Sequence, residues 1–236
     1  MEWILLVVTA WVAATISGVA GFGGSLIMLP LASHIMGAKQ AIPALTVAWL
    51  MGNLSRALLN LGAIRWKPVW LFSSGAVPAA FIGAKVFVEL PASLILKAIG
   101  VFLIGTVIIR HTSLNKELPP GWLVPTGVLV GFLSAIIGSA GPIGAAAFLS
   151  LNLPPVSYIA SEAVTAVFMH VTKTAVYGRY ELLSGKDLLL GIELGLAMVA
   201  GSWTAKKFLG VLSRQSFLIL VETLLVVSAV FLLIQS

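Results

Sequence analysis

The sequence has no cysteine and very few charged residues. Charged side chains make up 9% of its 236 residues, whereas roughly a quarter of the residues in soluble domains are charged. Without cysteine, the chain offers no disulfide bonds, thiolate metal sites or thiol redox chemistry. So little charge excludes an ordinary soluble domain, because the chain lacks the polar side chains that would cover its surface in water.

Hydrophobic residues take the place of the missing charges. They account for 59% of the chain, and the mean hydropathy is +1.08. Several apolar stretches reach the roughly 20 residues that a helix needs to cross a membrane. None of them alternates polar and apolar residues as the strands of a membrane barrel do. We therefore predict an all-α polytopic membrane protein, because backbone groups in lipid must bond within their own helix.

The net charge of +6 has two readings in a membrane protein. Basic residues are common in cytoplasmic loops and near lipid head groups, so membrane lipid is an expected partner. The alternative is a cationic path for a small anionic solute. We expect no nucleic acid partner and no cofactor, and the sequence does not determine the oligomeric state.

The apolar stretches form two series that one polar segment separates. The first series comprises residues 3–36, 42–61, 69–88 and 94–109, and the second comprises 122–151, 156–177, 188–205 and 217–234. Between them lies HTSLNKELPP, which begins at His111 and has the charges and prolines of a linker. We therefore divide the chain into a first transmembrane repeat (1–111), a linker (112–120) and a second transmembrane repeat (121–236).

The two series share residues at one constant offset, as an internal duplication predicts. Adding 117 to the residue number pairs Ser17 with Ser134, Gly21 with Gly138, Gly24 with Gly141, Asn53 with His170 and Arg56 with Lys173. If the first unit of each repeat turns back inside the membrane, each repeat crosses an odd number of times and the two are inverted. If that unit crosses fully, the repeats are parallel. We favour inverted repeats of four units each.

The first unit of each repeat is too long for one crossing. A single helix over residues 3–36 would be about 50 Å long at 1.5 Å per residue, whereas the hydrocarbon core is about 30 Å thick. The sequence GFGG interrupts this unit at residues 21–24, and GSAGP interrupts the corresponding unit at 138–142. Because glycine and proline weaken a helix, we predict a Gly-rich broken first helix in each repeat, followed by a half-helix.

The amino end of a half-helix inside a membrane suits an anion. Its amide hydrogens and the positive end of the helix dipole point at the break. Glycines also let membrane helices pack closely, and this alternative explains each cluster taken alone. Two clusters at matched positions favour a functional break. The residues that we expect to bind the solute are Gly21, Phe22, Gly23, Gly24, Ser25, Asn53, Arg56, Gly138, Ser139, Ala140, Gly141, His170 and Lys173.

The second unit of each repeat carries polar side chains on one helical face. Asn53 and Arg56 belong to this face in residues 42–61, and His170 and Lys173 belong to it in residues 156–177. Such a face should point into the bundle. Arg56 would then offer a fork of N–H donors to a sulfonate or carboxylate, with Lys173 as a second positive charge. Alternatively, both long side chains extend to the lipid head groups.

Two stretches of the chain also resemble a known family. They are SGVAGFGGSLIMLPLA (residues 17–32) and GFLSAIIGSAGPIGAAAFL (residues 131–149). The first resembles the first-repeat motif of the sulfite exporter TauE/SafE family. The second resembles that family's repeated motif in weaker form, since Ser139, Ala140 and Pro142 interrupt the glycines and Ala147 stands where the first stretch has Pro30. The resemblance implies a multi-pass protein of a prokaryotic inner membrane that moves sulfite, organosulfonates or related sulfur anions.

Moving an anion against its gradient requires an energy source. The sequence has no Gly-Lys-Ser or Gly-Lys-Thr phosphate-binding loop, so we expect secondary transport and no enzyme activity. Coupling to protons would require an ionisable group within the membrane. The candidates by depth are Glu162, His170, Glu193 and Glu222, and each could instead be a structural partner of a nearby group.

Three other classes stay open. An intramembrane serine hydrolase would use Ser139 and His170, although Gly-Ser-Ala-Gly differs from the Gly-x-Ser-Gly of rhomboid-type proteases. A metal or cation carrier would rely on the histidines, which are scattered along the chain, so we assign no metal site. The third class is an accessory membrane subunit that acts with a partner.

Overall fold

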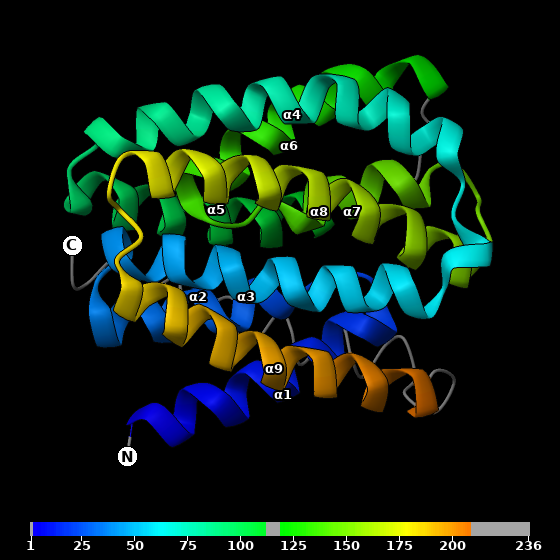
Figure 1. The fold of residues 1–236 in the computed structure, drawn as a ribbon. Coiled ribbons are helices and arrows are strands. Elements are labelled where there is room, and N and C mark those ends of the chain that lie inside the picture. The colour runs from blue at the N-terminus through cyan, green and yellow to red at the C-terminus, as the bar shows by residue number, and fades with distance from the viewer. Residues whose placement is uncertain (1, 112–118, 209–236) are drawn as a thin grey trace.

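The computed structural model describes residues 2–111 and 119–208, and these residues form helices without any strand (Figure 1). The α-helices are α1 (Glu2–Ala20), α2 (Gly24–Met36), α3 (Ala38–Leu59), α4 (Trp66–Glu89), α5 (Ala92–His111), α6 (Leu123–Ile137), α7 (Gly141–Leu149), α8 (Pro155–Arg179) and α9 (Gly185–Phe208), with single 3-10 turns at Leu61–Ala63 and Pro120–Trp122. The predicted all-α class is confirmed for these residues. The predicted unit 217–234, Glu222 and most of the predicted linker lie outside the described residues.

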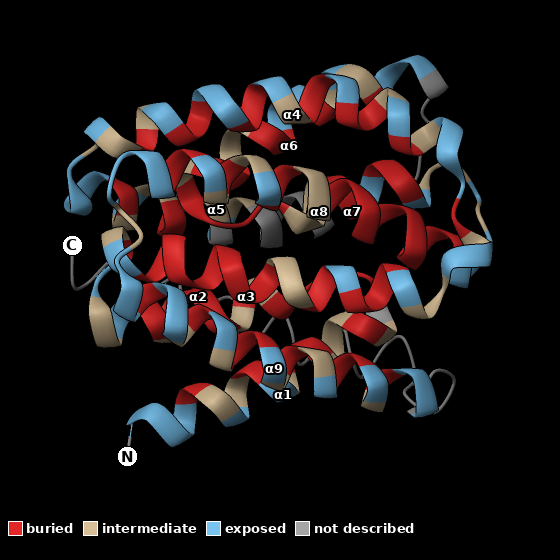
Figure 2. Ribbon diagram, viewed as in Figure 1, coloured by how far each residue is buried: buried red, intermediate tan, exposed pale blue. Residues whose placement is uncertain are grey.

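The helices have the length and surface of membrane spans. Within the described ranges, α1, α3, α4 and α9 are long and apolar enough to cross a membrane. Large apolar side chains such as Leu5, Phe81 and Trp203 remain exposed. Figure 2 shows exposed residues along the outer faces of α1 and α4, and buried residues along the helix faces inside the bundle. An integral membrane protein turns such outer faces toward lipid.

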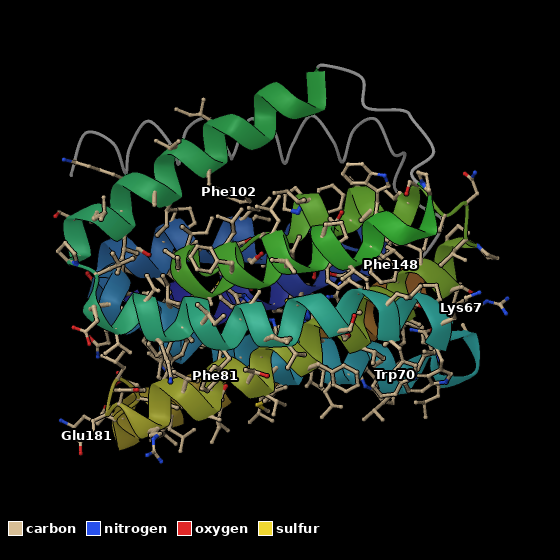
Figure 3. The ribbon with its side chains drawn as sticks, turned by 90° about the horizontal axis from the view of Figure 1, so that it is seen from above. Lys67, Trp70, Phe81, Phe102, Phe148 and Glu181 are labelled. Atoms are coloured by element: carbon tan, nitrogen blue, oxygen red, sulfur yellow. The ribbon has the colours of Figure 1, made fainter. Side chains whose placement is uncertain are left out.

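Two exposed charged residues mark the opposite ends of this bundle. Figure 3 shows Lys67 and Glu181 at opposite ends, with Phe81 of α4 between them. Trp70, which is exposed, lies at the same end as Lys67. Tryptophan favours the boundary between lipid and water, so this distribution fits an apolar band bounded by two polar interfaces.

Both predicted helix breaks are confirmed. Helix α1 ends at Ala20 and α2 begins at Gly24, while α6 ends at Ile137 and α7 begins at Gly141. The backbone φ angles are 84° at Gly21, 105° at Gly23 and 78° at Gly138. L-residues with side chains rarely adopt these angles, so glycine at these positions lets the chain leave the helix and start another one.

Glycines also lie where helices pack closely, as between α4 and α6 and between α1 and α9. On α6, a Cβ added at Gly127 or Gly131 would meet the backbone of α4. On α4, one added at Gly75 or Gly83 would meet the backbone of α6. Small residues allow this approach, and dispersion contacts between close backbones help to hold helices together in lipid.

A matched pair of glycine substitutions tests the α4–α6 contact. Gly131→Ala places a methyl group against the carbonyl oxygen of Ala76, so we expect the free energy of unfolding to fall by about 1–3 kcal/mol. Gly178→Ala lies on the exposed face of α8 with open space around it. It should leave stability unchanged or raise it slightly, because alanine favours a helix. Thermal unfolding in detergent measures both variants, and equal midpoints would contradict the packing described here.

Candidate functional site

The two breaks face a common cavity of about 80 Å³. Of the residues predicted from sequence to bind a solute, those that line the cavity are Gly21, Phe22, Gly23, Gly24, Ser25, Asn53, Arg56, Gly138, Ser139, Ala140, Gly141 and His170. Glu162, predicted as a coupling group, lines it as well. Segments more than a hundred residues apart in the chain therefore meet in one place.

The two Gly-rich turns touch each other at the cavity lining. Ser25 Oγ and Ser139 Oγ lie 2.6 Å apart and share a hydrogen bond. Ser25 belongs to the first turn of α2, and Ser139 precedes α7. The first amides of a helix have no acceptor within it, and the helix dipole is positive at this end. The cavity is thus bordered by the amino ends of α2 and α7.

Arg56 reaches the cavity from α3 and also binds the end of α1. Its Nη1 donates to the carbonyl oxygens of Ser17, at 2.9 Å, and Gly21, at 3.4 Å. Its Nη2 donates to Asn53 Oδ1 and lies 3.6 Å from Glu162 Oε2. Because only 8% of Arg56 is exposed, the alternative that its side chain extends to the lipid head groups is wrong.

Lys173 makes the corresponding contact at the second break, but it does not line the cavity. Its Nζ donates to the carbonyl oxygen of Ser134 at 3.2 Å, and Tyr177 Oη donates to that of Ala135 at 2.6 Å. Both side chains are fully buried, so Lys173 does not extend to head groups either. These donors satisfy carbonyls at the carboxyl end of α6, where the helix provides no further amide hydrogens. Lys173 thus stabilises the break and does not face the cavity.

Three buried polar atoms on the cavity wall have no hydrogen-bond partner. They are Trp49 Nε1, Glu162 Oε2 and His170 Nδ1. The Trp49 and His170 rings also contact each other, with their centroids 5.9 Å apart. Buried polar groups are normally paired, because leaving one unpaired costs about 1–3 kcal/mol. The three atoms differ in what they need, because the Trp49 N–H requires an acceptor whereas the Glu162 carboxylate oxygen requires a donor.

Some of the cavity residues were not predicted from sequence. Helical spacing places Trp49 on the polar face of α3, one turn before Asn53, but it was not among the residues expected to bind the solute. Met198 and Ser202 line the cavity from α9, and neither differs in type from ordinary packing residues. Glu193 lies on α9 but is not among the lining residues.

The geometry also bears on two of the alternative classes. The hydroxyl of Ser139 is paired with that of Ser25, whereas a hydrolase would need it to donate to a base such as His170. Among the described residues, no three histidine, aspartate or glutamate side chains lie close enough to hold a metal ion.

Comparison with protein families gives one match. The model of the family described as sulfite exporter TauE/SafE matches residues 6–232, which is nearly the whole chain. No curated protein and no solved structure matches the chain.

The hydroxyl group of Tyr177 donates to a carbonyl at the carboxyl end of α6 and provides a test of what stabilises the second break. Tyr177→Phe leaves the carbonyl of Ala135 without its donor, so we expect the free energy of unfolding to fall by about 1–2 kcal/mol. Tyr180→Phe removes the same group from an exposed side chain and should change stability little. Thermal unfolding in detergent compares the two, and an unaffected Tyr177→Phe would show that the contact does not stabilise α6.

Proposed function

Because the chain belongs to the sulfite exporter TauE/SafE family of membrane transporters, we propose that it is a secondary transporter for sulfite or an organosulfonate. The family implies transport of a small anion across a membrane. The proposal adds the site, which is the cavity between the two helix breaks. One observation carries this proposal: two helix amino ends, a buried arginine and an unpaired indole N–H converge on that cavity.

The donors around the cavity suit the oxygen atoms of a sulfur oxyanion. The indole N–H of Trp49 has no partner, and Ser25 and Ser139 add hydroxyl groups to the cavity lining. Arg56 supplies the positive charge, and hydrogen bonds to ionised groups are shorter and stronger than neutral ones. Helix amino ends bind anions through their free amides and dipole. The anion would therefore exchange its water shell for fixed donors.

Two repeats of opposite direction, 1–111 and 121–236 joined by the linker 112–120, form the second part of the proposal. The pairing of α1 with α9 corresponds to that of α6 with α4. The contact of Arg56 with Ser17 corresponds to that of Lys173 with Ser134, and each spans 39 residues. In Figure 1, α3 runs from left to right and α8 runs from right to left. These correspondences support inverted repeats, which transporters use to open one site to alternate sides.

Flux through the purified chain in liposomes tests the proposal. We expect saturable uptake of labelled sulfite and of a short sulfonate, and a loss of at least about tenfold in Arg56→Gln, because the charged donor to the anion is gone. Arg65→Gln makes the same change at an exposed residue outside the cavity and should keep its flux.

The outcomes separate the alternatives. Absence of flux above empty liposomes for every sulfur anion would overturn the transport assignment for the isolated chain and would favour an accessory subunit. Equal loss of flux in Arg56→Gln and Arg65→Gln would remove Arg56 from the site. A pH gradient across the same liposomes tests proton coupling, since a coupled carrier accelerates when protons flow in the direction of the solute.

A second substitution tests the indole donor alone. Trp49→Phe keeps an aromatic ring against His170 but removes the N–H group. We expect the half-saturating sulfonate concentration to rise about tenfold, because one hydrogen bond to a charged group is worth about 1.5–3 kcal/mol. Trp203→Phe, which changes an exposed tryptophan of α9, serves as the control. An unchanged concentration dependence in Trp49→Phe would place the anion elsewhere.

A further inference from the structure

Glu162 is a buried carboxylate on the wall of the cavity. Only 9% of the residue is exposed. Its Oε2 lies 3.6 Å from Arg56 Nη2, which is too long for a hydrogen bond, and has no hydrogen-bond partner. A buried carboxylate without a counter-charge costs several kcal/mol. Glu162 therefore depends on Arg56 for its negative charge.

Arg56 cannot move freely to serve a second anion. Its Nη1 is held by the carbonyls at the end of α1, and its Nη2 donates to Asn53. The guanidinium is thus held in place beside Glu162, and both residues line the cavity. An anion that binds Arg56 from the cavity must approach the position where Glu162 now balances its charge.

We propose that Glu162 is a tethered competitor of the transported anion, and that the anion displaces it from Arg56 while Glu162 takes up one proton. This inference rests on the proposed function of the cavity. The charges balance: Arg56 is first neutralised by the Glu162 carboxylate and afterwards by the anion, and Glu162 becomes a neutral carboxylic acid. The proton comes from the aqueous solution on the side from which the anion enters.

Few other ionisable groups face Glu162 within the described part of the chain. The ionisable group that α3 places beside Glu162 is Arg56. His170 shares the cavity wall, and Lys173 lies further along α8, where it binds the α6 terminus. The lining residues from the two turns, α4, α6 and α9 have no ionisable side chain. His170 is therefore the group to control for.

Coupling of this kind has a definite stoichiometry. One proton accompanies each anion, so transport of a monovalent anion would carry no net charge and would follow the pH gradient. A divalent anion would carry one net negative charge. Since anion binding takes up a proton, affinity must rise as pH falls, by at most about tenfold per pH unit for one proton.

Calorimetric binding of methanesulfonate to the purified protein tests the inference. A sulfonate keeps its charge over the working range, so any proton taken up on binding is bound by the protein and released by the buffer. Titrations in two buffers of different ionisation enthalpy give the number of protons taken up. For the unmodified protein we expect about one proton per anion and binding that weakens at least about tenfold from pH 6 to pH 8.

Two variants assign the proton. Glu162→Gln keeps the shape of the side chain without its charge, so it should bind methanesulfonate with no proton uptake and less than about twofold change between pH 6 and pH 8. At pH 8 it should bind more tightly than the unmodified protein, because the competing carboxylate is gone. His170→Asn should keep the proton uptake even if its affinity is lower.

Each result supports or overturns a defined statement. Proton uptake that persists in Glu162→Gln, or is lost in His170→Asn, overturns the role of Glu162 and leaves the anion site in place. Binding without proton uptake by the unmodified protein overturns it as well, whether or not the variant can be purified. Absence of methanesulfonate binding in every form, together with absence of flux, overturns the proposed function itself.

Discussion

A helix that ends inside a membrane leaves carbonyl groups without donors, and lipid supplies none. The rest of this structure depends on how that constraint is met. Arg56 donates to the last carbonyls of α1, and Lys173 donates to a carbonyl near the end of α6. Both bases also complement the negative end of the helix dipole. The amino ends of α2 and α7 then remain beside the cavity. Each break therefore has a carboxyl end whose carbonyls accept from a base and an amino end that adds polar groups to the cavity lining.

The two breaks nevertheless differ chemically. A guanidinium has donors on several sides, so Arg56 binds α1 and still borders the cavity. The ammonium of Lys173 is a compact group, and it binds α6 below the cavity without lining it. In the described residues the cavity therefore has a single permanent positive charge, balanced by one carboxylate. Under the proposed function, this balance would suit a solute of low charge.

The sequence was sufficient for the helix breaks and for the side chains nearest to them. GFGG and GSAGP interrupt units that are too long to cross once, and the Arg56 face follows from helical spacing. The Ser25–Ser139 contact and the Arg56–Glu162 pair depend on which helices become neighbours, and periodicity along one helix does not contain this information. Glu193 was a candidate for proton coupling because of its expected depth in the membrane. Depth does not determine which face of α9 meets the cavity, and the residues of α9 that line it are Met198 and Ser202.

The pairing of helices has a consequence for movement. Helix α6 packs into the groove of α4 through glycines on both sides, and α9 packs on α1 in the same way. Each tight pair combines one helix from before residue 111 with one from after residue 121. The halves of the sequence therefore cannot slide apart as two bodies without separating backbones that touch. Any movement that opens the cavity would have to keep the α4–α6 and α1–α9 contacts together, and glycines of α9 also tie that helix closely to α3.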